Sequence, residues 1–193
     1  MNIWFAKAAV IAASVVMIAI RAPHGRRSRT VKVAKRRAGP LEKSLLAFAI
    51  LGFVVPLLWL WSPVMAFADY PLEPVAFWSG VLCLAVGLWL FHRAHADLGT
   101  NWSITLEVRE GHRLVTNGIY RRIRHPMYSA LFLYSVGLAL VLPNWVAGPS
   151  YLVPFALLFA LRVGAEERMM VEEFGADYEA YKTRTKRLVP GVW

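Results

Sequence analysis

A dense polar and basic segment at residues 111–128 carries the side chains best suited to chemistry in this chain. It holds two histidines, four arginines and two tyrosines, and it runs directly into an apolar stretch. The chain as a whole is 58% hydrophobic. Because polar side chains beside a bilayer are costly to hold in place, a cluster of this size favours a site over a simple connection.

Pro126 predicts where a helix begins within this segment. Proline is well suited to the first helical turn, so His125 should lie at or just before the helix start. The free amides of such a turn attract anions, including carboxylates. Arg124, His125 and Tyr128 would add side-chain donors at the same level. The alternative is a positively charged anchor at the membrane interface, with a tyrosine in the aromatic belt.

A second cluster follows at Arg162 and Glu166, which share a helix face because they are four residues apart. Glu167 and Arg168 come next. The plain interpretation is an ion-pair ladder on an exposed helix, which contributes little stability. The functional interpretation is that this face meets residues 111–128. There an unpaired arginine would bind an anionic group and a carboxylate would bind a cationic or hydroxyl-rich one.

A third segment has aromatic and apolar residues at three- and four-residue spacing, namely Val171, Phe174, Tyr178 and Tyr181. This pattern predicts an amphipathic helix or helix pair lying along the surface, as a lid or brace over the site.

Five apolar runs are candidates for membrane spans, because each is near the length needed to cross a bilayer. They are residues 2–20, 44–68, 75–91, 127–142 and 145–161. The fourth is slightly short, and the break at 142–145 predicts a tight helical hairpin between the last two. The first run could also be the core of a signal peptide, but no convincing small-residue cleavage site follows it, which favours a retained span.

The net charge of +10 is unevenly placed. Residues 21–43 hold nine Lys or Arg against one acid, and residues 92–127 hold six against three. Since basic loops are retained in the cytoplasm, we expect the N-terminus outside, and the site and the C-terminus inside. Nucleic-acid binding is not favoured, because no recognition module accompanies the charge. The loop 21–43 could be partly disordered.

Other classes of site find little support in the sequence. Cys83 is the single cysteine, so a disulfide framework is excluded. His92, His95 and Asp97 would make only a sparse metal site, so we expect no metal and interpret them as interfacial residues. The sequence has no glycine-rich phosphate loop, Walker motif or nucleophile elbow.

These patterns predict an all-α integral membrane fold with five transmembrane helices and a cytoplasmic C-terminal amphipathic segment that covers the site. Residues 1–91 would form an N-terminal three-span region. Residues 92–193 would form the region that carries the site, with a helical hairpin at 127–161.

Several motifs taken in order closely resemble the isoprenylcysteine carboxyl methyltransferase family. They are Gly111-His112-x-Leu114-Val115-Thr116-x-Gly118-Ile119-Tyr120, Arg124-His125-Pro126-Met127-Tyr128, Arg162-x-x-x-Glu166-Glu167, Glu173-Phe174-Gly175-x-x-Tyr178-x-x-Tyr181 and Val189-Pro190. The segment Asp97-Leu98-Gly99-x-Asn101-Trp102-Ser103 also resembles prokaryotic members. The resemblance covers about half the chain, and five spans suit the compact prokaryotic branch.

The resemblance implies an integral membrane enzyme that transfers a methyl group from S-adenosylmethionine and releases S-adenosylhomocysteine. Residues 92–193 would then be its catalytic region, and the C-terminal segment would cover a cofactor pocket. The implied cofactor-binding residues are His112, Arg113, Leu114, Val115, Tyr120, His125, Pro126, Met127, Tyr128 and Glu166. Arg162 is implied to face the methyl acceptor, and Arg162 with Glu166 form the candidate catalytic pair. The implied location is a bacterial or archaeal inner membrane.

The acceptor stays open between three chemistries. A carboxylate such as a prenylated C-terminal cysteine is the first expectation, and it needs no general base because it is already ionised. A phospholipid amine or a small thiol would need one, from Glu166, Glu167 or a histidine. A nicotinamide-dependent enzyme like the sterol reductases and a non-enzymatic membrane scaffold are further alternatives. The general base and the oligomeric state are not determined.

Overall fold

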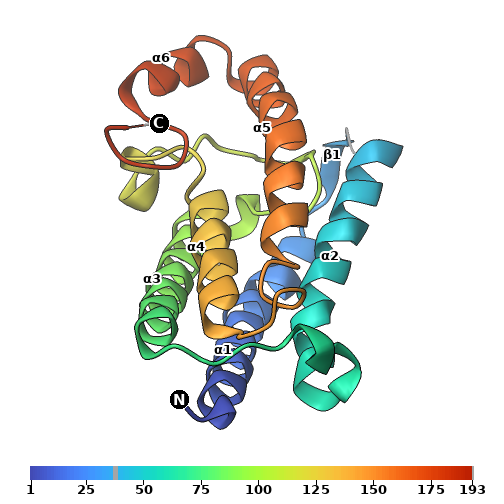
Figure 1. Ribbon diagram of the computed structural model, residues 1–193. Helices are drawn as coiled ribbons and strands as arrows, with labels where there is room; N and C mark the ends of the chain where they lie inside the picture. The colour runs from blue at the N-terminus through green and yellow to red at the C-terminus, as the bar shows by residue number, and fades with distance from the viewer. Residues whose placement is uncertain (37–38, 193) are drawn as a thin grey trace.

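Helices form almost the whole molecule (Figure 1). The computed structural model describes residues 1–36 and 39–192. In chain order the elements are α1 (Ile3–Arg29), β1 (Val33–Arg36), α2 (Pro40–Trp61), η1 (Pro63–Ala68), α3 (Pro74–Leu98), η2 (Gly99–Asn101), β2 (Glu107–Arg109), η3 (Gly118–Arg121), α4 (Pro126–Val141), α5 (Leu152–Phe174) and α6 (Ala176–Arg184). The N-terminus lies at one end of the helical body, and α6 with the C-terminus lies at the other.

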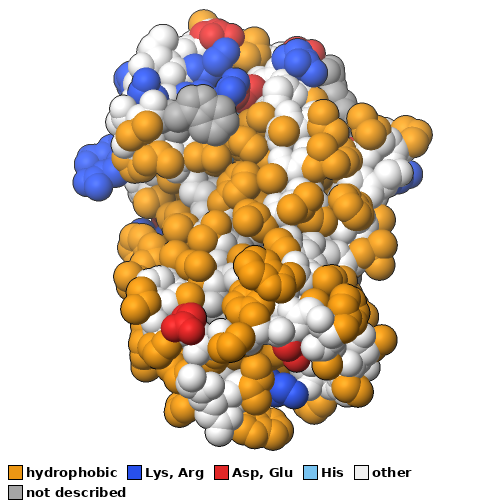
Figure 2. Space-filling view, in the orientation of Figure 1, with side chains coloured by type: hydrophobic (Ala, Val, Ile, Leu, Met, Phe, Trp, Pro, Cys, Tyr) orange, Lys and Arg blue, Asp and Glu red, His pale blue; other side chains and the backbone are white. Residues whose placement is uncertain are grey.

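Three helical stretches in the described part of the chain are long and apolar enough to cross a membrane, namely Ile3–Ser28, Pro40–Trp61 and Pro74–Asn101. α4 is apolar but shorter, with 16 residues. Large hydrophobic side chains are widely exposed, and Trp61, Phe67 and Val75 are each about four-fifths accessible. Figure 2 shows these apolar side chains over much of one face, with charged side chains gathered near the end that holds α6. Such a surface suits contact with lipid.

Several predicted boundaries were wrong. The first run does not end at residue 20, because α1 continues through Pro23 to Arg29 and makes part of the basic loop helical. The second run splits at Ser62, whose extended backbone ends α2 and whose hydroxyl caps η1 by accepting the Val64 amide hydrogen bond. α3 extends past residue 91 to Leu98. Possible disorder in the loop stays a prediction, and residues 37–38 lie outside the described residues.

The fifth run also begins later than predicted, at Leu152 rather than 145. Residues 142–151 instead form a compact turn fixed by Asn144, which is fully buried. Its amide nitrogen donates to Asp69 Oδ1 at 2.6 Å, and its carbonyl oxygen accepts from the amide of Ala147 at 2.7 Å. Because these bonds satisfy a buried side chain, the turn between α4 and α5 has one defined geometry.

An all-α fold was an incomplete prediction, since β1 and β2 form a small antiparallel sheet. Val33 is paired with Arg109, and the register shifts before Lys35. The strands are four and three residues long. Strands this short have too few residues to show the alternation of apolar and polar side chains that predicts a strand. The pairing also joins segments more than 70 residues apart, so no local pattern indicates it.

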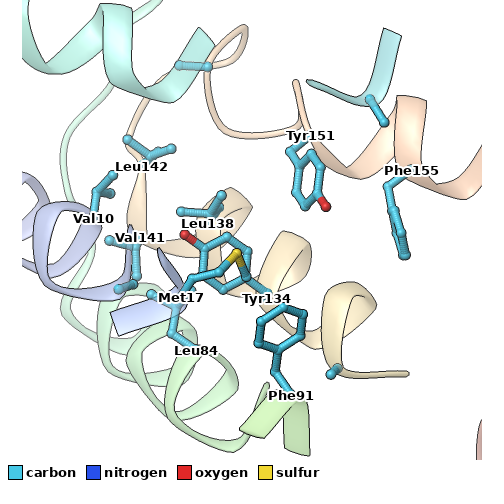
Figure 3. Packing of buried hydrophobic residues seen from close by; sticks show 14 of the residues in the cluster. Val10, Met17, Leu84, Phe91, Tyr134, Leu138, Val141, Leu142, Tyr151 and Phe155 are labelled. Carbon is cyan, nitrogen blue, oxygen red and sulfur yellow. The ribbon is translucent and has the colours of Figure 1, made fainter. Parts of the chain in front are cut away.

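α3 and α4 pack closely against each other around glycines on both helices. A Cβ added at Gly137 would lie 2.7 Å from Leu84 Cγ and 2.9 Å from the Leu84 nitrogen. One added at Gly80 would lie 2.9 Å from the Gly137 carbonyl oxygen. Small residues allow this backbone approach between membrane helices. Tyr134 and Leu138 of α4 are buried beside this seam (Figure 3).

We expect Gly137→Ala to lower the melting temperature in detergent, because its methyl group meets backbone that cannot move aside. Overpacking of this kind costs about 1–3 kcal/mol, which exceeds the gain of about 1 kcal/mol in helix propensity. Gly164→Ala on α5 is the matched control, since its nearest neighbour is the flexible end of Arg168 at 3.5 Å. Equal melting temperatures for the two variants would contradict the close-packed seam.

Candidate active site

A cavity of about 370 Å³ lies among α1, α2, α4, α5 and the segments that precede α4. Its volume is within the usual range for small-molecule sites. Nearly all the site residues expected from the sequence line it: His112, Arg113, Leu114, Val115, Tyr120, His125, Met127, Tyr128, Arg162 and Glu166. Pro126 is buried at the start of α4 and does not line the cavity. The fold therefore brings together segments that are some 50 residues apart in the chain.

The other part of the cavity wall is apolar and comes from the first two helices. Met17 and Ile18 of α1 and Leu46, Ile50 and Phe53 of α2 line it. Phe155 and Leu158 of α5 continue the same surface. The cavity thus has a polar side built by residues 112–128 and 162–166, and an apolar side built by helices that face lipid.

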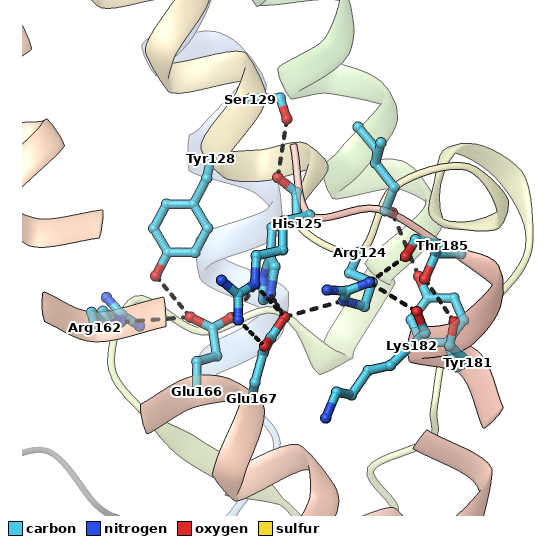
Figure 4. A network of polar contacts seen from close by, with 12 residues as sticks. Arg124, His125, Tyr128, Ser129, Arg162, Glu166, Glu167, Tyr181, Lys182 and Thr185 are labelled. Carbon is cyan, nitrogen blue, oxygen red and sulfur yellow. Dashed lines mark hydrogen bonds and ion pairs between the residues drawn. The ribbon is translucent and has the colours of Figure 1, made fainter. Parts of the chain in front are cut away.

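Glu166 lies at the polar side, with 26% of its side chain exposed. Tyr128 donates a hydrogen bond to Glu166 Oε2 at 2.7 Å. Arg162 Nε is 3.8 Å from the same oxygen, and His125 Nδ1 is 3.8 Å from Oε1 (Figure 4). A partly exposed carboxylate with neutral and cationic neighbours can accept hydrogen bonds from a ligand's ammonium or hydroxyl groups.

Glu167 points away from Glu166 and holds a separate cluster of cations. Its carboxylate accepts from Arg124 Nε at 3.1 Å and from Arg187 Nη2 at 2.8 Å. His125 Nε2 lies 3.3 Å away, so this ring sits between the two carboxylates (Figure 4). Burial alone would raise the pKa of Glu167, but hydrogen bonds from His125 and Arg187 and the charge of Arg124 outweigh it and hold the pKa well below its usual range.

The two backbone amides just before α4 bond to the C-terminal segment. The amide of Arg124 donates to the Lys186 carbonyl at 2.8 Å, and that of His125 donates to the Arg187 carbonyl at 3.0 Å. The Ser129 hydroxyl donates to the Leu188 carbonyl at 2.7 Å. These two amides lie before the helix, so the expectation that the free amides of its first turn attract an anion stays a prediction.

α6 follows a sharp break at Gly175, whose φ of +53° lies in the left-handed region that favours glycine. Tyr178 and Tyr181 point from α6 into the cavity wall. The Tyr181 hydroxyl donates to the Tyr120 carbonyl at 2.6 Å, which ties α6 to the polar segment. Burial raises the pKa of Tyr181 to about 12, so this hydroxyl stays protonated at neutral pH.

Arg162 is not the unpaired arginine that the sequence suggested. Besides Glu166, it faces Glu42 from the first turn of α2, with Nη2 3.6 Å from Glu42 Oε1. Its side chain is only 10% exposed. Nothing in the sequence pattern marked Glu42, since it appears as one acid within a basic loop.

Other supporting residues were also missed. Asp97 accepts a hydrogen bond from the Ile119 amide at 2.8 Å, and its carboxylate occupies the space beside Gly118, where any side chain would collide with it. Asp97 therefore fixes the turn that carries Tyr120. His95 is fully buried and its Nδ1 lies 2.9 Å from the Phe91 carbonyl, so it packs in the core rather than at an interface. The upstream Asp-Leu-Gly-x-Asn-Trp-Ser motif was the signal available for Asp97.

We expect Glu167→Gln to destabilise the protein by about 3 kcal/mol at neutral pH, because it leaves buried cations without their counter-charge. The folded pKa of Glu167 is depressed, so its stabilisation is present above the unfolded pKa of about 4.3 and is lost as the pH falls further. The difference in melting temperature between wild type and variant should therefore shrink below pH 4. Tryptophan fluorescence in detergent measures it, and a constant difference down to pH 3 would contradict the assignment.

Residues 75–177, more than half of the chain, match the family model described as phospholipid methyltransferase. The chain is similar to the protein-S-isoprenylcysteine O-methyltransferase of Dictyostelium discoideum, with 32% identity over 60% of this chain and 49% of that protein. The human protein of the same name is 32% identical over 59% of this chain and 41% of its own length. The chain thus spans about half the length of the curated relatives it matches.

A solved structure has a similar fold. It is that of the eukaryotic intramembrane Ras methyltransferase ICMT, with a TM-score of 0.57 and 24% identity, covering 78% of this chain and 53% of that one. The resemblance noted in the sequence to the isoprenylcysteine carboxyl methyltransferases is confirmed by these matches. From the match over residues 75–177, the chain belongs to the phospholipid methyltransferase family.

Proposed function

We propose that this chain is an integral membrane methyltransferase that uses S-adenosylmethionine to methylate an amphipathic acceptor, with a carboxylate such as that of a prenylated C-terminal cysteine as the leading candidate. One observation carries the proposal. Side chains from residues 112–128 and 162–166 converge on a single cavity, in a chain that belongs to a methyltransferase family. The names of its relatives support the same chemistry and acceptor.

The donor and acceptor groups around the cavity suit S-adenosylmethionine. Glu166 offers a carboxylate to an ammonium group, and Arg113 offers a cation to a carboxylate. Met127, Leu114 and Val115 offer apolar surface for a purine ring. When bound, S-adenosylmethionine supplies a methyl group that is already activated for transfer.

The chain's own residues would then mainly orient the reactants and exclude water. An acceptor carboxylate is ionised at neutral pH, so no residue has to remove a proton from it. Arg162 would bind that carboxylate at the polar side, while the apolar wall of α1 and α2 would receive the acceptor's hydrocarbon part. Tyr178 and Tyr181 of α6 would act as part of a lid over the cofactor.

The proposal includes a membrane arrangement. Five spans would place the N-terminus outside and the cavity's polar side with the C-terminus in the cytoplasm. The basic residues between the first two spans support it, because such loops stay on the cytoplasmic side. The division into residues 1–91 and 92–193 places the predicted boundary inside α3.

The decisive experiment is transfer of a labelled methyl group into a membrane extract by the purified protein. We expect label in a lipid-like product that releases volatile methanol on alkaline hydrolysis, as methyl esters do. Label that resists alkali would instead identify an amine or thiol acceptor. Tight NADPH binding, with no methyl transfer and no binding of S-adenosylhomocysteine, would overturn the proposal.

We expect Glu166→Gln to weaken S-adenosylhomocysteine binding by about tenfold, since a charged hydrogen-bond acceptor is lost. Isothermal titration calorimetry in detergent measures the change. Glu179→Gln is the matched control, because that carboxylate lies on α6, is 54% exposed and forms a surface ion pair with Lys182. Equal affinity of the two variants for S-adenosylhomocysteine would show that Glu166 does not bind the cofactor.

For Arg162→Gln we expect cofactor binding within about twofold of wild type and methyl transfer reduced by tenfold or more, because the acceptor loses its cationic partner. Calorimetry and initial rates at saturating cofactor measure the two quantities. A parallel loss of both would contradict an acceptor-side role.

A further inference from the structure

Glu42 is a buried carboxylate that lies outside the residues matched by the family model. It sits in the first turn of α2, and its side chain is 7% exposed. An acid at this position of a helix is ordinarily exposed and acts only through the helix dipole. Burying a carboxylate is costly unless it has partners, so its location calls for a specific role.

The partners of Glu42 come from two other parts of the chain. Its Oε1 accepts a hydrogen bond from the Leu106 amide at 2.9 Å and lies 3.6 Å from Arg162 Nη2. Its Oε2 is buried without a hydrogen-bond partner. The hydrogen bond from Leu106 fixes Oε1, the same oxygen that lies 3.6 Å from Arg162 Nη2. It therefore orients the charge of the carboxylate toward the guanidinium.

Arg162 is held by charge from two sides rather than by hydrogen bonds. Glu42 lies 3.6 Å from its Nη2 and Glu166 lies 3.8 Å from its Nε, and Nε has no hydrogen-bond partner. Glu166 in turn accepts the hydrogen bond from Tyr128. If the charge of Glu42 were removed, the remaining attraction would draw Arg162 onto Glu166.

We propose that Glu42 is a positioning residue that holds Arg162 apart from Glu166. This separation keeps Glu166 accessible to the cofactor and the guanidinium accessible to the acceptor. This role rests on the proposed function. It makes α2, which precedes the family-matched residues, part of the polar side of the site. Glu42 itself does not line the cavity, so it acts through Arg162.

A double-mutant cycle on methyl transfer tests this role. Glu42→Gln keeps an oxygen for the Leu106 amide and removes only the charge, and we expect it to lower kcat/KM for the acceptor about tenfold. In the Arg162→Gln background, the same change should have an effect below about twofold. Additive losses, or an unchanged kcat/KM for Glu42→Gln alone, would overturn the proposal. Should Glu42→Gln not fold, the cycle is measured with Glu42→Asp, whose shorter side chain keeps the charge but withdraws it from Arg162, and the same non-additivity is expected.

A second measurement does not depend on turnover. The Nε–H resonance of Arg162, assigned by its loss in Arg162→Gln, reports the surroundings of the guanidinium in detergent micelles. We expect it to shift in Glu42→Gln and to stay in place in Glu179→Gln. An unmoved resonance would show that Glu42 does not position Arg162. If wild type transfers no methyl group, the proposed function fails, and this resonance still decides the role of Glu42.

Discussion

The ionised carboxylate of Glu167 is the constraint on which the geometry of the polar side depends. It holds Arg124 and His125 just before α4 and Arg187 after α6, so three distant segments meet at one side chain. The attraction between the opposite charges offsets the cost of burying these groups. Because Glu167 and Glu166 are neighbours on α5, fixing one directs the other toward the cavity, where it meets Tyr128.

The C-terminal segment completes this arrangement through its backbone. Carbonyl groups of residues 186–188 accept hydrogen bonds from the start of α4, and Tyr181 bonds to the Tyr120 carbonyl. The amides before α4 are thereby used internally. Glu166 and Arg113 line the cavity on this side, where we propose that their side chains bind the cofactor.

The apolar side of the cavity is built by a different part of the chain. α1 and α2 supply Met17, Ile18, Leu46, Ile50 and Phe53, and all of these precede the residues that match the family model. The family-matched region thus builds most of the polar side, whereas the helices before it shape the surface that an acceptor's hydrocarbon part would contact. α3 packs closely on α4 through Gly80 and Gly137, and Gly87 of α3 lies against the Ala130 carbonyl nearer the start of α4.

The sequence by itself determined the helical character, the apolar helices and a group of polar residues that line the cavity. Hydrophobic runs, Pro126 and the spacing of Arg162 and Glu166 are local signals, whereas the cofactor-binding residues were implied by the resemblance of the ordered motifs to a family. The sequence did not predict that helices end at Arg29, Trp61 and Leu98, since turns and caps compete with hydrophobicity at these positions. Only the tertiary structure decided the pairing of Glu42 with Arg162, of Glu167 with Arg124, His125 and Arg187, and of β1 with β2. These partners lie far apart in the chain, and burial, which no local pattern encodes, is what makes their pairing necessary.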